Sequence, residues 1–88
     1  MEVRTFVITN KLGLHARAAA MLVQAASAFE AEIQVEKDGM EVNGKSIMGL
    51  LMLAAPQGSS LTVRAKGPDA GAALERLSAI IDGKFGEE

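Results

Sequence analysis

Residues 13–29 read GLHARAAAMLVQAASAF, and this stretch organises the interpretation of the whole chain. From residue 16 onward it is almost wholly helix-forming, and apolar side chains recur at the three- and four-residue spacing of one helix face. We therefore expect a helix over residues 16–29. The side chains expected to face the core are Ala19, Leu22, Ala26 and Phe29.

Segments on both sides of this helix alternate apolar and polar residues, a pattern that predicts strands. The expected strands are residues 2–9, 30–36, 40–42 and 60–66, and the turn KDG at 37–39 joins two of them into a hairpin. In the last strand Leu61, Val63 and Ala65 share one face, with Ile33 and Val35 paired in the same way earlier in the chain.

Two further helices are indicated by apolar spacing and by their boundaries. NGKS at 43–46 introduces a helix over residues 47–54, which PQGS at 56–59 ends. GPD at 67–69 introduces a last helix that closes at Gly83. The core-facing side chains expected from these helices are Ile47, Leu50, Leu51, Ala73, Leu74, Leu77 and Ile80.

The element order is therefore β-α-β-β-α-β-α. It predicts an α+β fold, an open-faced two-layer sandwich in which three helices cover one face of a four-stranded antiparallel sheet. The chain has 88 residues, so we expect a single domain spanning residues 1–88.

Composition argues against several functional classes. A net charge of −2 and three Phe without Trp or Tyr give little basis for binding nucleic acid. Because cysteine is absent and there is one histidine, we expect no metal and no cofactor. No apolar run approaches the ~18–20 residues of a membrane span, and the N-terminus lacks a signal-peptide pattern. We expect a cytoplasmic monomer without membrane insertion.

The chain's one histidine, His15, directly precedes the first predicted helix. Backbone N–H groups and the positive end of the helix dipole would hold an anion attached to its ring. The same field disfavours an imidazolium and leaves a neutral nitrogen able to attack phosphorus. Arg17 can supply a second positive group to that anion. These features predict a histidine that accepts a phosphoryl group, and the alternative is a surface histidine that packs or caps the helix start.

Two other features point to regulation and to partner binding. Ser46 is a good N-cap for the second helix, which alone explains a serine there. Exposed methionines suit a surface that binds several partners, although core filling is the common alternative for helical methionines. The residues expected to form this docking surface are Ala20, Met21, Gln24, Ile47, Met48 and Met52.

GMEVNGKS at 39–46 also fits the P-loop expression G-x-x-x-x-G-K-S. A P-loop requires a strand before its first glycine, whereas residues 40–42 are better explained as a hairpin strand. A chain of 88 residues also lacks room for the parallel core of a nucleotide hydrolase, so we expect no nucleotide site.

Two motifs carry a family resemblance. GLHAR at 13–17 with Ala19 resembles the active-site motif of the HPr family, the histidine phosphocarriers of the bacterial phosphotransferase system. NGKSIMGL at 43–50 resembles the family's second motif, around a regulatory serine, and the resemblance covers essentially the whole chain. The chain departs from the usual family pattern at Ala18, where proline is usual, and at Leu12, where a small polar residue is more frequent.

The resemblance implies a sheet order of 1-4-2-3 and a phosphocarrier without turnover of its own. His15 would accept the phosphoryl group through Nδ1 from enzyme I and pass it to a histidine of enzyme IIA domains. Arg17 would neutralise the phosphoryl oxygens, and the N–H groups of Ala16 and Arg17 would complete the anion site. Ser46 would be the target of an HPr kinase/phosphorylase, and we expect its phosphorylation to slow the phosphorylation of His15.

Two alternatives remain open at this stage. TNKLG at 9–13 and LLML at 50–53 also resemble the nitrogen-regulatory paralogue of HPr, whereas residues 45–47 resemble the kinase-regulated type. A phosphorylation-independent binding module that uses the two-helix apolar face is the alternative from another class. The terminal pair Glu87-Glu88 is expected to be a solvated end.

Overall fold

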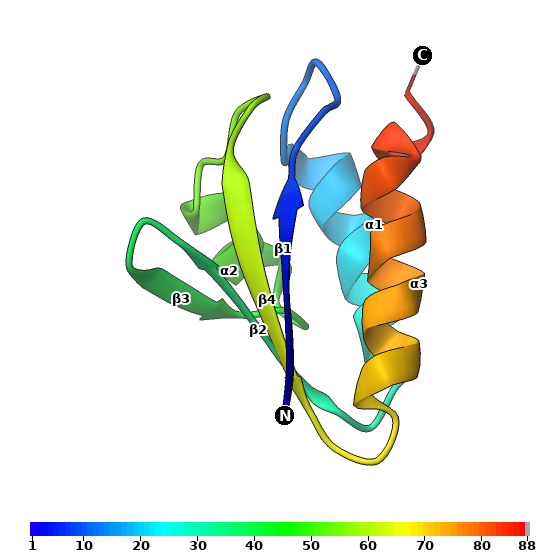
Figure 1. The fold of residues 1–88 in the computed structure, drawn as a ribbon. Coiled ribbons are helices and arrows are strands. Elements are labelled where there is room, and N and C mark those ends of the chain that lie inside the picture. The colour runs from blue at the N-terminus through cyan, green and yellow to red at the C-terminus, as the bar shows by residue number, and fades with distance from the viewer. Residues whose placement is uncertain (88) are drawn as a thin grey trace.

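The computed structural model describes residues 1–87 (Figure 1). Its strands are β1 (Glu2–Val7), β2 (Glu32–Lys37), β3 (Met40–Asn43) and β4 (Ser60–Lys66). Its helices are α1 (Ala16–Ser27), α2 (Ile47–Met52) and α3 (Ala70–Asp82), and a short 3-10 helix, η1 (Lys84–Gly86), follows α3. The predicted element order is confirmed, with η1 as an addition. No helix within residues 1–87 is both long and apolar enough to cross a membrane.

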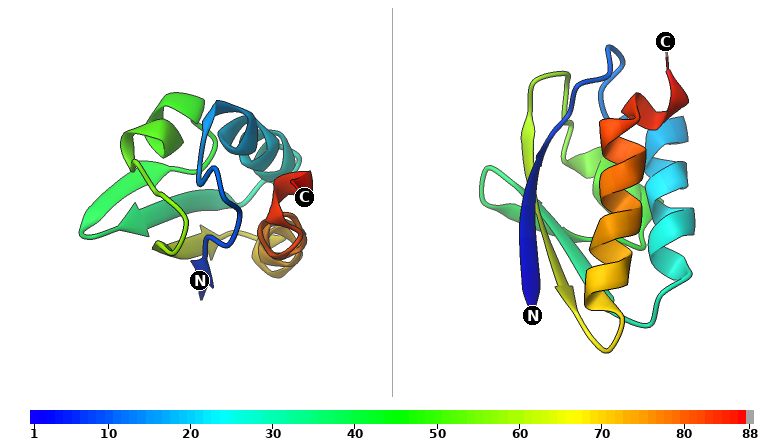
Figure 2. Two further views of the ribbon diagram at one scale, coloured as in Figure 1. Left: turned by 90° about the horizontal axis from the view of Figure 1, so that it is seen from above. Right: turned by 45° about the vertical axis from the view of Figure 1, so that its right-hand side comes forward.

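The four strands form one antiparallel sheet in the order β1-β4-β2-β3. Thr5 of β1 stands opposite Thr62 of β4, and Val63 of β4 stands opposite Val35 of β2. The helices lie on one face of this sheet and leave the other face open (Figures 1 and 2). The predicted open-faced sandwich and the strand order that the resemblance implied are both confirmed.

The core fills the space between the sheet and the helices. Leu61, Val63 and Ala65 of β4 are buried, as their alternation predicted. Helix α1 contributes mainly small side chains, which allow the helix to pack closely on its neighbours. Its buried residues are Ala18, Ala19, Leu22, Ala25 and Ala26.

The prediction of core residues in α2 was wrong for two of three positions. Leu50 is fully buried, but Ile47 and Leu51 are 42% and 36% exposed. The observed α2 has six residues, fewer than predicted, and a helix of that length turns only a narrow face towards the sheet. The exposed apolar side chains of α2 are therefore available at the surface.

Two further core predictions differ in detail from the structure. In α3 Ile81 is buried, whereas Ile80 is only partly buried. Two adjacent apolar residues point about 100° apart on a helix, so spacing alone did not decide which one faces inward. Phe29 lies beyond the end of α1 and is also only partly buried.

Gly13 fixes the position of the loop that leads into α1. Its φ angle is +67°, and a Cβ atom there would lie 2.5 Å from the carbonyl oxygen of Ala55. The N–H of Leu14 donates to the same carbonyl oxygen at 2.8 Å. Because glycine permits this close approach, the loop after α2 determines where α1 begins.

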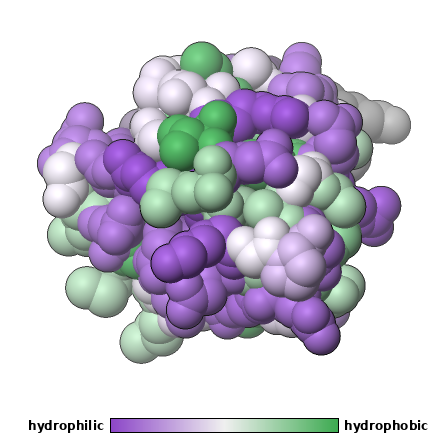
Figure 3. All heavy atoms as spheres, turned by 60° about the horizontal axis from the view of Figure 1, so that its bottom comes forward, coloured by the Kyte–Doolittle hydropathy of each residue, from purple (hydrophilic) through white to green (hydrophobic). Residues whose placement is uncertain are grey.

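The end of the molecule that is lowest in Figure 1 holds the loops that precede β2 and α3. Figure 3 brings this end forward and shows mostly hydrophilic residues, with apolar ones in small separate groups. The Asp69 carboxylate joins the two loops by accepting the N–H groups of Glu30 and Ala31, each at 2.9 Å. The hydrogen bond from the Glu30 N–H lowers the pKa of Asp69; partial burial opposes this shift, and the hydrogen bond from Ala31 adds to it.

Candidate functional site

His15 occupies the N-cap position of α1, with an extended backbone (φ −80°, ψ 179°). Its N–H donates to the Gly13 carbonyl oxygen at 3.0 Å, and its carbonyl oxygen accepts the N–H of Ala19 at 2.8 Å. Its side chain makes no capping hydrogen bond to the helix. The backbone of His15 therefore starts the helix while the ring remains available for other contacts.

The start of α1 leaves several backbone donors open. Helix geometry gives the N–H groups of Ala16, Arg17 and Ala18 no carbonyl partner within the helix. The start of α2 differs, because the Ser46 hydroxyl oxygen accepts the N–H of Gly49 at 3.0 Å. Open donors and the positive end of the helix dipole favour an anion at the start of α1.

The ring of His15 contacts the C-terminal segment. His15 Nε2 lies 3.1 Å from Glu87 Oε2. The same carboxylate accepts a hydrogen bond from Asn10 Nδ2 at 2.6 Å and a longer one, at 3.4 Å, from the N–H of Leu12. Three groups that precede α1 therefore fix the position of the Glu87 side chain.

These contacts determine how the imidazole carries its proton. Partial burial raises the pKa of the Glu87 carboxyl, but the hydrogen bonds from Asn10 and His15 outweigh it. The resulting pKa lies below the ordinary value, so Glu87 is an ionised group that only accepts hydrogen bonds. The hydrogen of the neutral ring therefore lies on Nε2, and the lone pair lies on Nδ1. Nδ1 makes no hydrogen bond within residues 1–87.

A hollow of about 280 Å³ opens beside the ring. We call it the His15 hollow, and its lining residues are Leu12, His15, Arg17, Phe85, Gly86 and Glu87. The structure thus brings His15 and Arg17 to one site. Within residues 1–87 no carboxylate pairs with the Arg17 guanidinium, which is exposed and available to an anion.

The backbone of the C-terminal segment is bent so that Glu87 reaches His15. Lys84 and Phe85 both adopt left-handed conformations, with φ angles of 56° and 54°. Such conformations are strained for residues other than glycine and persist where packing holds them. Phe85 is buried, so its side chain anchors the turn that carries Glu87 back to α1.

Two residues of this site were missed in the sequence. Glu87 and Glu88 were expected to form a solvated end. For Glu87 this was wrong, because its side chain is only 20% exposed and is hydrogen-bonded, and Glu88 lies outside the described residues. Asn10 is 1% exposed and also donates to the Gly13 carbonyl oxygen at 2.8 Å. Its Oδ1 has no partner within residues 1–87, because both acceptors face Nδ2. Nothing local in the sequence links residues 10 and 87.

The residues of the expected docking surface differ in exposure, and two of them, Met21 and Gln24, line a hollow against α3. On α2 the side chains of Met48 and Met52 are 73% and 66% exposed, and Ile47 is exposed beside Ser46. On α1 Gln24 is exposed and Ala20 is half-buried. Met21 is half-buried and lines a hollow with residues of α3.

Known proteins resemble this chain over nearly its whole length. Residues 3–82 match the family model "PTS HPr component phosphorylation site". The phosphocarrier protein HPr of Treponema pallidum is 46% identical over 88 residues and is covered completely, as is this chain. The phosphocarrier protein NPr of Shewanella violacea is 46% identical over 84 residues, covering 96% of this chain and 92% of its own length.

Solved structures agree with this result. HPr-C-His from Thermoanaerobacter tengcongensis has a TM-score of 0.96 and 49% identity, and the match covers 100% of this chain and 99% of that one. A structure described as an HPr dimer from the same organism has a TM-score of 0.80 and 48% identity, covering 99% of this chain and 100% of that one. Fold, family match and relatives together place this chain in the HPr family of phosphocarrier proteins of the phosphotransferase system.

Proposed function

We propose that His15 receives a phosphoryl group from phospho-enzyme I and passes it to a histidine of enzyme IIA-type acceptors. One observation carries the proposal: His15 and Arg17 line one hollow at a helix start whose N–H groups have no intrahelical partner. A phosphoryl group on Nδ1 would meet those donors and the Arg17 guanidinium. The chain acts as a transfer intermediate and has no turnover of its own.

The transfer step follows from the position of the ring proton. The Nδ1 lone pair of His15 attacks phosphorus in line with the bond between phosphorus and the donor histidine nitrogen. As the new P–N bond forms, the old one breaks and its electron pair returns to the donor nitrogen. Positive charge develops on the His15 ring, and the Glu87 carboxylate at Nε2 offsets it. Arg17 and the N–H of Ala16 face the phosphoryl oxygens.

Onward transfer requires that the carrier not hold its group too tightly. The His15 side chain is 28% exposed, and Arg17 is exposed. A site open to solvent weakens electrostatic attraction compared with an enclosed one. This geometry supports a relay. Transfer from His15 to an acceptor histidine then has a free energy similar to that of transfer from enzyme I to His15.

We further propose regulation at Ser46 by an HPr kinase/phosphorylase. Ser46 lies beside the exposed Ile47 and Met48. A phosphate there would carry about −1.5 to −2 charge and would place it within an apolar docking surface. It would also replace the hydroxyl that caps Gly49. The expected effect is slower phosphoryl transfer from enzyme I to His15.

Phosphoryl transfer is tested by incubating the chain with enzyme I and labelled phosphoenolpyruvate. We expect a label that is labile in acid and stable in base, and that is absent from His15→Ala. Arg17→Gln should transfer roughly a hundredfold more slowly, as for loss of one charge-stabilising donor. Arg76→Gln is the matched control, because it removes an arginine outside the His15 hollow. Absence of label in the wild type would favour a phosphorylation-independent binding module that uses the α1/α2 surface.

The physiological branch depends on the acceptors. We propose the sugar-transport type, supported by the resemblance of residues 45–47 to the kinase-regulated HPr proteins. An HPr relative and an NPr relative are each 46% identical to this chain, so a panel of enzyme IIA domains from the same genome is the discriminating experiment. Preferential transfer to a nitrogen-regulatory IIA domain would assign the chain to the other branch.

We propose that the working form is a cytoplasmic monomer with a single domain. The described residues of one chain supply every group of the His15 hollow, so a second copy is not required to complete it. Sedimentation at several concentrations tests this point. Because a related HPr has been solved as a dimer, a concentration-dependent dimer that still accepts the label would replace the monomer as the working form.

A further inference from the structure

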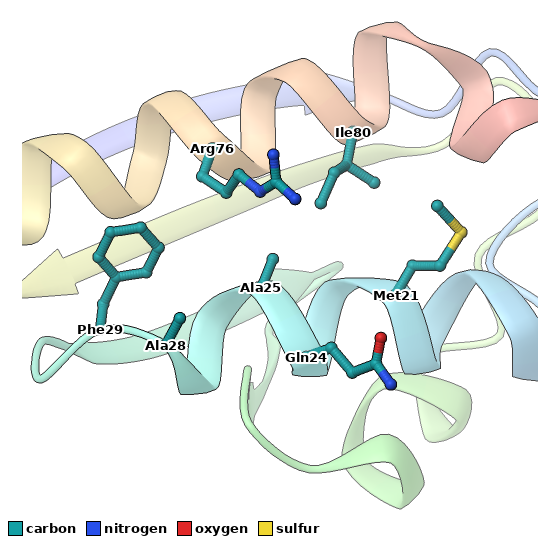
Figure 4. A pocket seen from close by; sticks show the side chains of 7 residues that line it. All are labelled: Met21, Gln24, Ala25, Ala28, Phe29, Arg76 and Ile80. Carbon is teal, nitrogen blue, oxygen red and sulfur yellow. The ribbon is translucent and has the colours of Figure 1, made fainter.

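A second hollow, of about 300 Å³, lies between α1 and α3. We call it the α1/α3 hollow, and Figure 4 shows its lining residues, Met21, Gln24, Ala25, Ala28, Phe29, Arg76 and Ile80. None of these residues lines the His15 hollow. The transfer chemistry proposed at His15 uses none of them.

The sequence of α1 produces this hollow. Ala25 and Ala28 present small side chains, while Met21 and Phe29 stand at the two ends (Figure 4). The seven steps from Met21 to Ala28 correspond to a rise of roughly 10 Å along the helix. Ile80 adds an apolar wall from α3. The result is a short groove with mostly apolar walls.

Arg76 gives this groove a positive charge. Of the four arginines, Arg4 and Arg64 bind carboxylates of this chain. Within residues 1–87 Arg17 and Arg76 have no such partner, and each lines one of the two hollows. Figure 4 shows the Arg76 guanidinium in the gap between the two helices. A guanidinium fork in this position is ready to bind a planar carboxylate with two hydrogen bonds.

We propose that the α1/α3 hollow binds a small amphipathic carboxylate, whose apolar body lies between Met21 and Phe29 and whose charged end pairs with Arg76. The volume is at the lower end of the range for small-molecule sites. The one cation among the lining residues matches a monoanion better than a dianion. Gln24, which is exposed, is the other polar residue among those that line the hollow. The site shares Met21 and Gln24 with the expected docking surface and uses none of the residues that line the His15 hollow.

Octanoate, kept below its critical micelle concentration, is a direct probe. We expect saturable changes in the amide NMR signals of Met21, Ala25, Ala28, Arg76 and Ile80 when the full chain is titrated. The amide signals of His15 and Arg17 should stay unchanged. Octan-1-ol has the same apolar body without charge and octylamine reverses the charge, so both should bind at least about tenfold more weakly than octanoate.

Two variants test the contacts separately. Arg76→Gln should weaken octanoate binding at least about tenfold, whereas Arg17→Gln, the matched loss of an unpaired arginine, should leave it unchanged. Ala28→Leu should abolish binding by filling the groove, and Ala28 is exposed, so the fold should tolerate the larger side chain. Circular dichroism of each variant checks that the fold is retained.

Four outcomes would overturn the proposal. Octan-1-ol binding as tightly as octanoate, or unchanged affinity in Arg76→Gln, would mean non-specific apolar contact. Loss of binding in Arg17→Gln would place the carboxylate in the His15 hollow. Changes at the same amide signals on concentrating the protein without octanoate would mean that a second copy occupies the groove.

Discussion

His15 Nε2 and Glu87 Oε2 lie 3.1 Å apart although 72 residues separate them in the chain. The carboxylate selects the tautomer that leaves Nδ1 free to attack. Glu87 does not touch the reacting phosphorus in this arrangement, so it is a positioning residue for His15.

Replacing Glu87 by glutamine should disturb this arrangement. The amide removes the negative charge that stabilises a positive ring and can present a donor to Nε2, so the two tautomers become closer in energy. We expect transfer from enzyme I to slow by roughly tenfold. Nitrogen-15 chemical shifts of the ring should show a larger share of the Nδ1–H tautomer.

Glu32→Gln is the matched control for this change, because it removes one exposed carboxylate that has no hydrogen bond to His15. It should change neither the tautomer nor the rate. An unaltered ring spectrum in Glu87→Gln would show that the contact does not set the tautomer.

Gly13→Ala should destabilise the fold by about 2–4 kcal/mol. The new Cβ would lie 2.5 Å from the Ala55 carbonyl oxygen at a residue whose φ is +67°. Gly39→Ala is the control, because Gly39 also has a positive φ but no atom lies within 4 Å of its Cβ position. The free energy of unfolding of Gly39→Ala should fall by about 1 kcal/mol, which is the cost of a left-handed backbone conformation for alanine. Urea unfolding measures both, and equal losses would mean that the contact with Ala55 relaxes freely.

Ser46→Ala should lower the free energy of unfolding by about 1 kcal/mol, since it removes the oxygen that accepts the Gly49 N–H. Transfer from enzyme I should remain at the wild-type rate. Ser46→Asp keeps a capping oxygen and adds negative charge, so stability should be retained while transfer slows. Equal transfer rates for Ser46→Asp and the wild type would contradict the proposed regulation.

The stability that the Asp69 carboxylate contributes should decrease as the pH falls. Its folded-state pKa is lowered from 3.8, so the carboxylate stabilises the fold fully above pH 3.8 and loses this contribution as the pH falls through the lower folded value. Unfolding free energies of the wild type and Asp69→Asn should therefore differ most near neutral pH and converge in acid. A difference that stays constant down to the lowest pH would exclude a role for the ionised form.

Local patterns predicted most of the fold because strands and long helices repeat their apolar residues regularly. The alternation in β4 placed Leu61, Val63 and Ala65 in the core without error. The short α2 offered too few residues for a period, which is why Ile47 and Leu51 were misplaced. The strand order came from the family resemblance, since alternation does not specify which strands are neighbours.

The residues of the candidate site also fall into those that local sequence predicts and those that it does not. His15 and Arg17 belong to one helix start, so their proximity could be predicted from the sequence. Asn10 and Glu87 reach the site through tertiary structure. Gly83 and Gly86 flank Lys84 and Phe85, but nothing in the local sequence marks these two non-glycine residues as left-handed. The hollow beside Arg76 likewise depends on how α1 and α3 pack against each other.

The N–H groups at the start of α1 have no carbonyl partner within the helix. Because they can bind a phosphoryl group on His15, the stability of the fold is linked to the free energy of hydrolysis of the P–N bond. Any free energy that the bound phosphoryl group gains from the donors of Ala16 and Arg17 raises the unfolding free energy of the phosphorylated carrier. It lowers the free energy available for onward transfer by the same amount. Each tenfold gain in retention, about 1.4 kcal/mol, is a tenfold loss in delivery to the next protein. A serine at this position would accept one of these N–H groups with its own side chain. Fewer donors would then be left for the phosphoryl group, and its attachment would change the stability of the fold less.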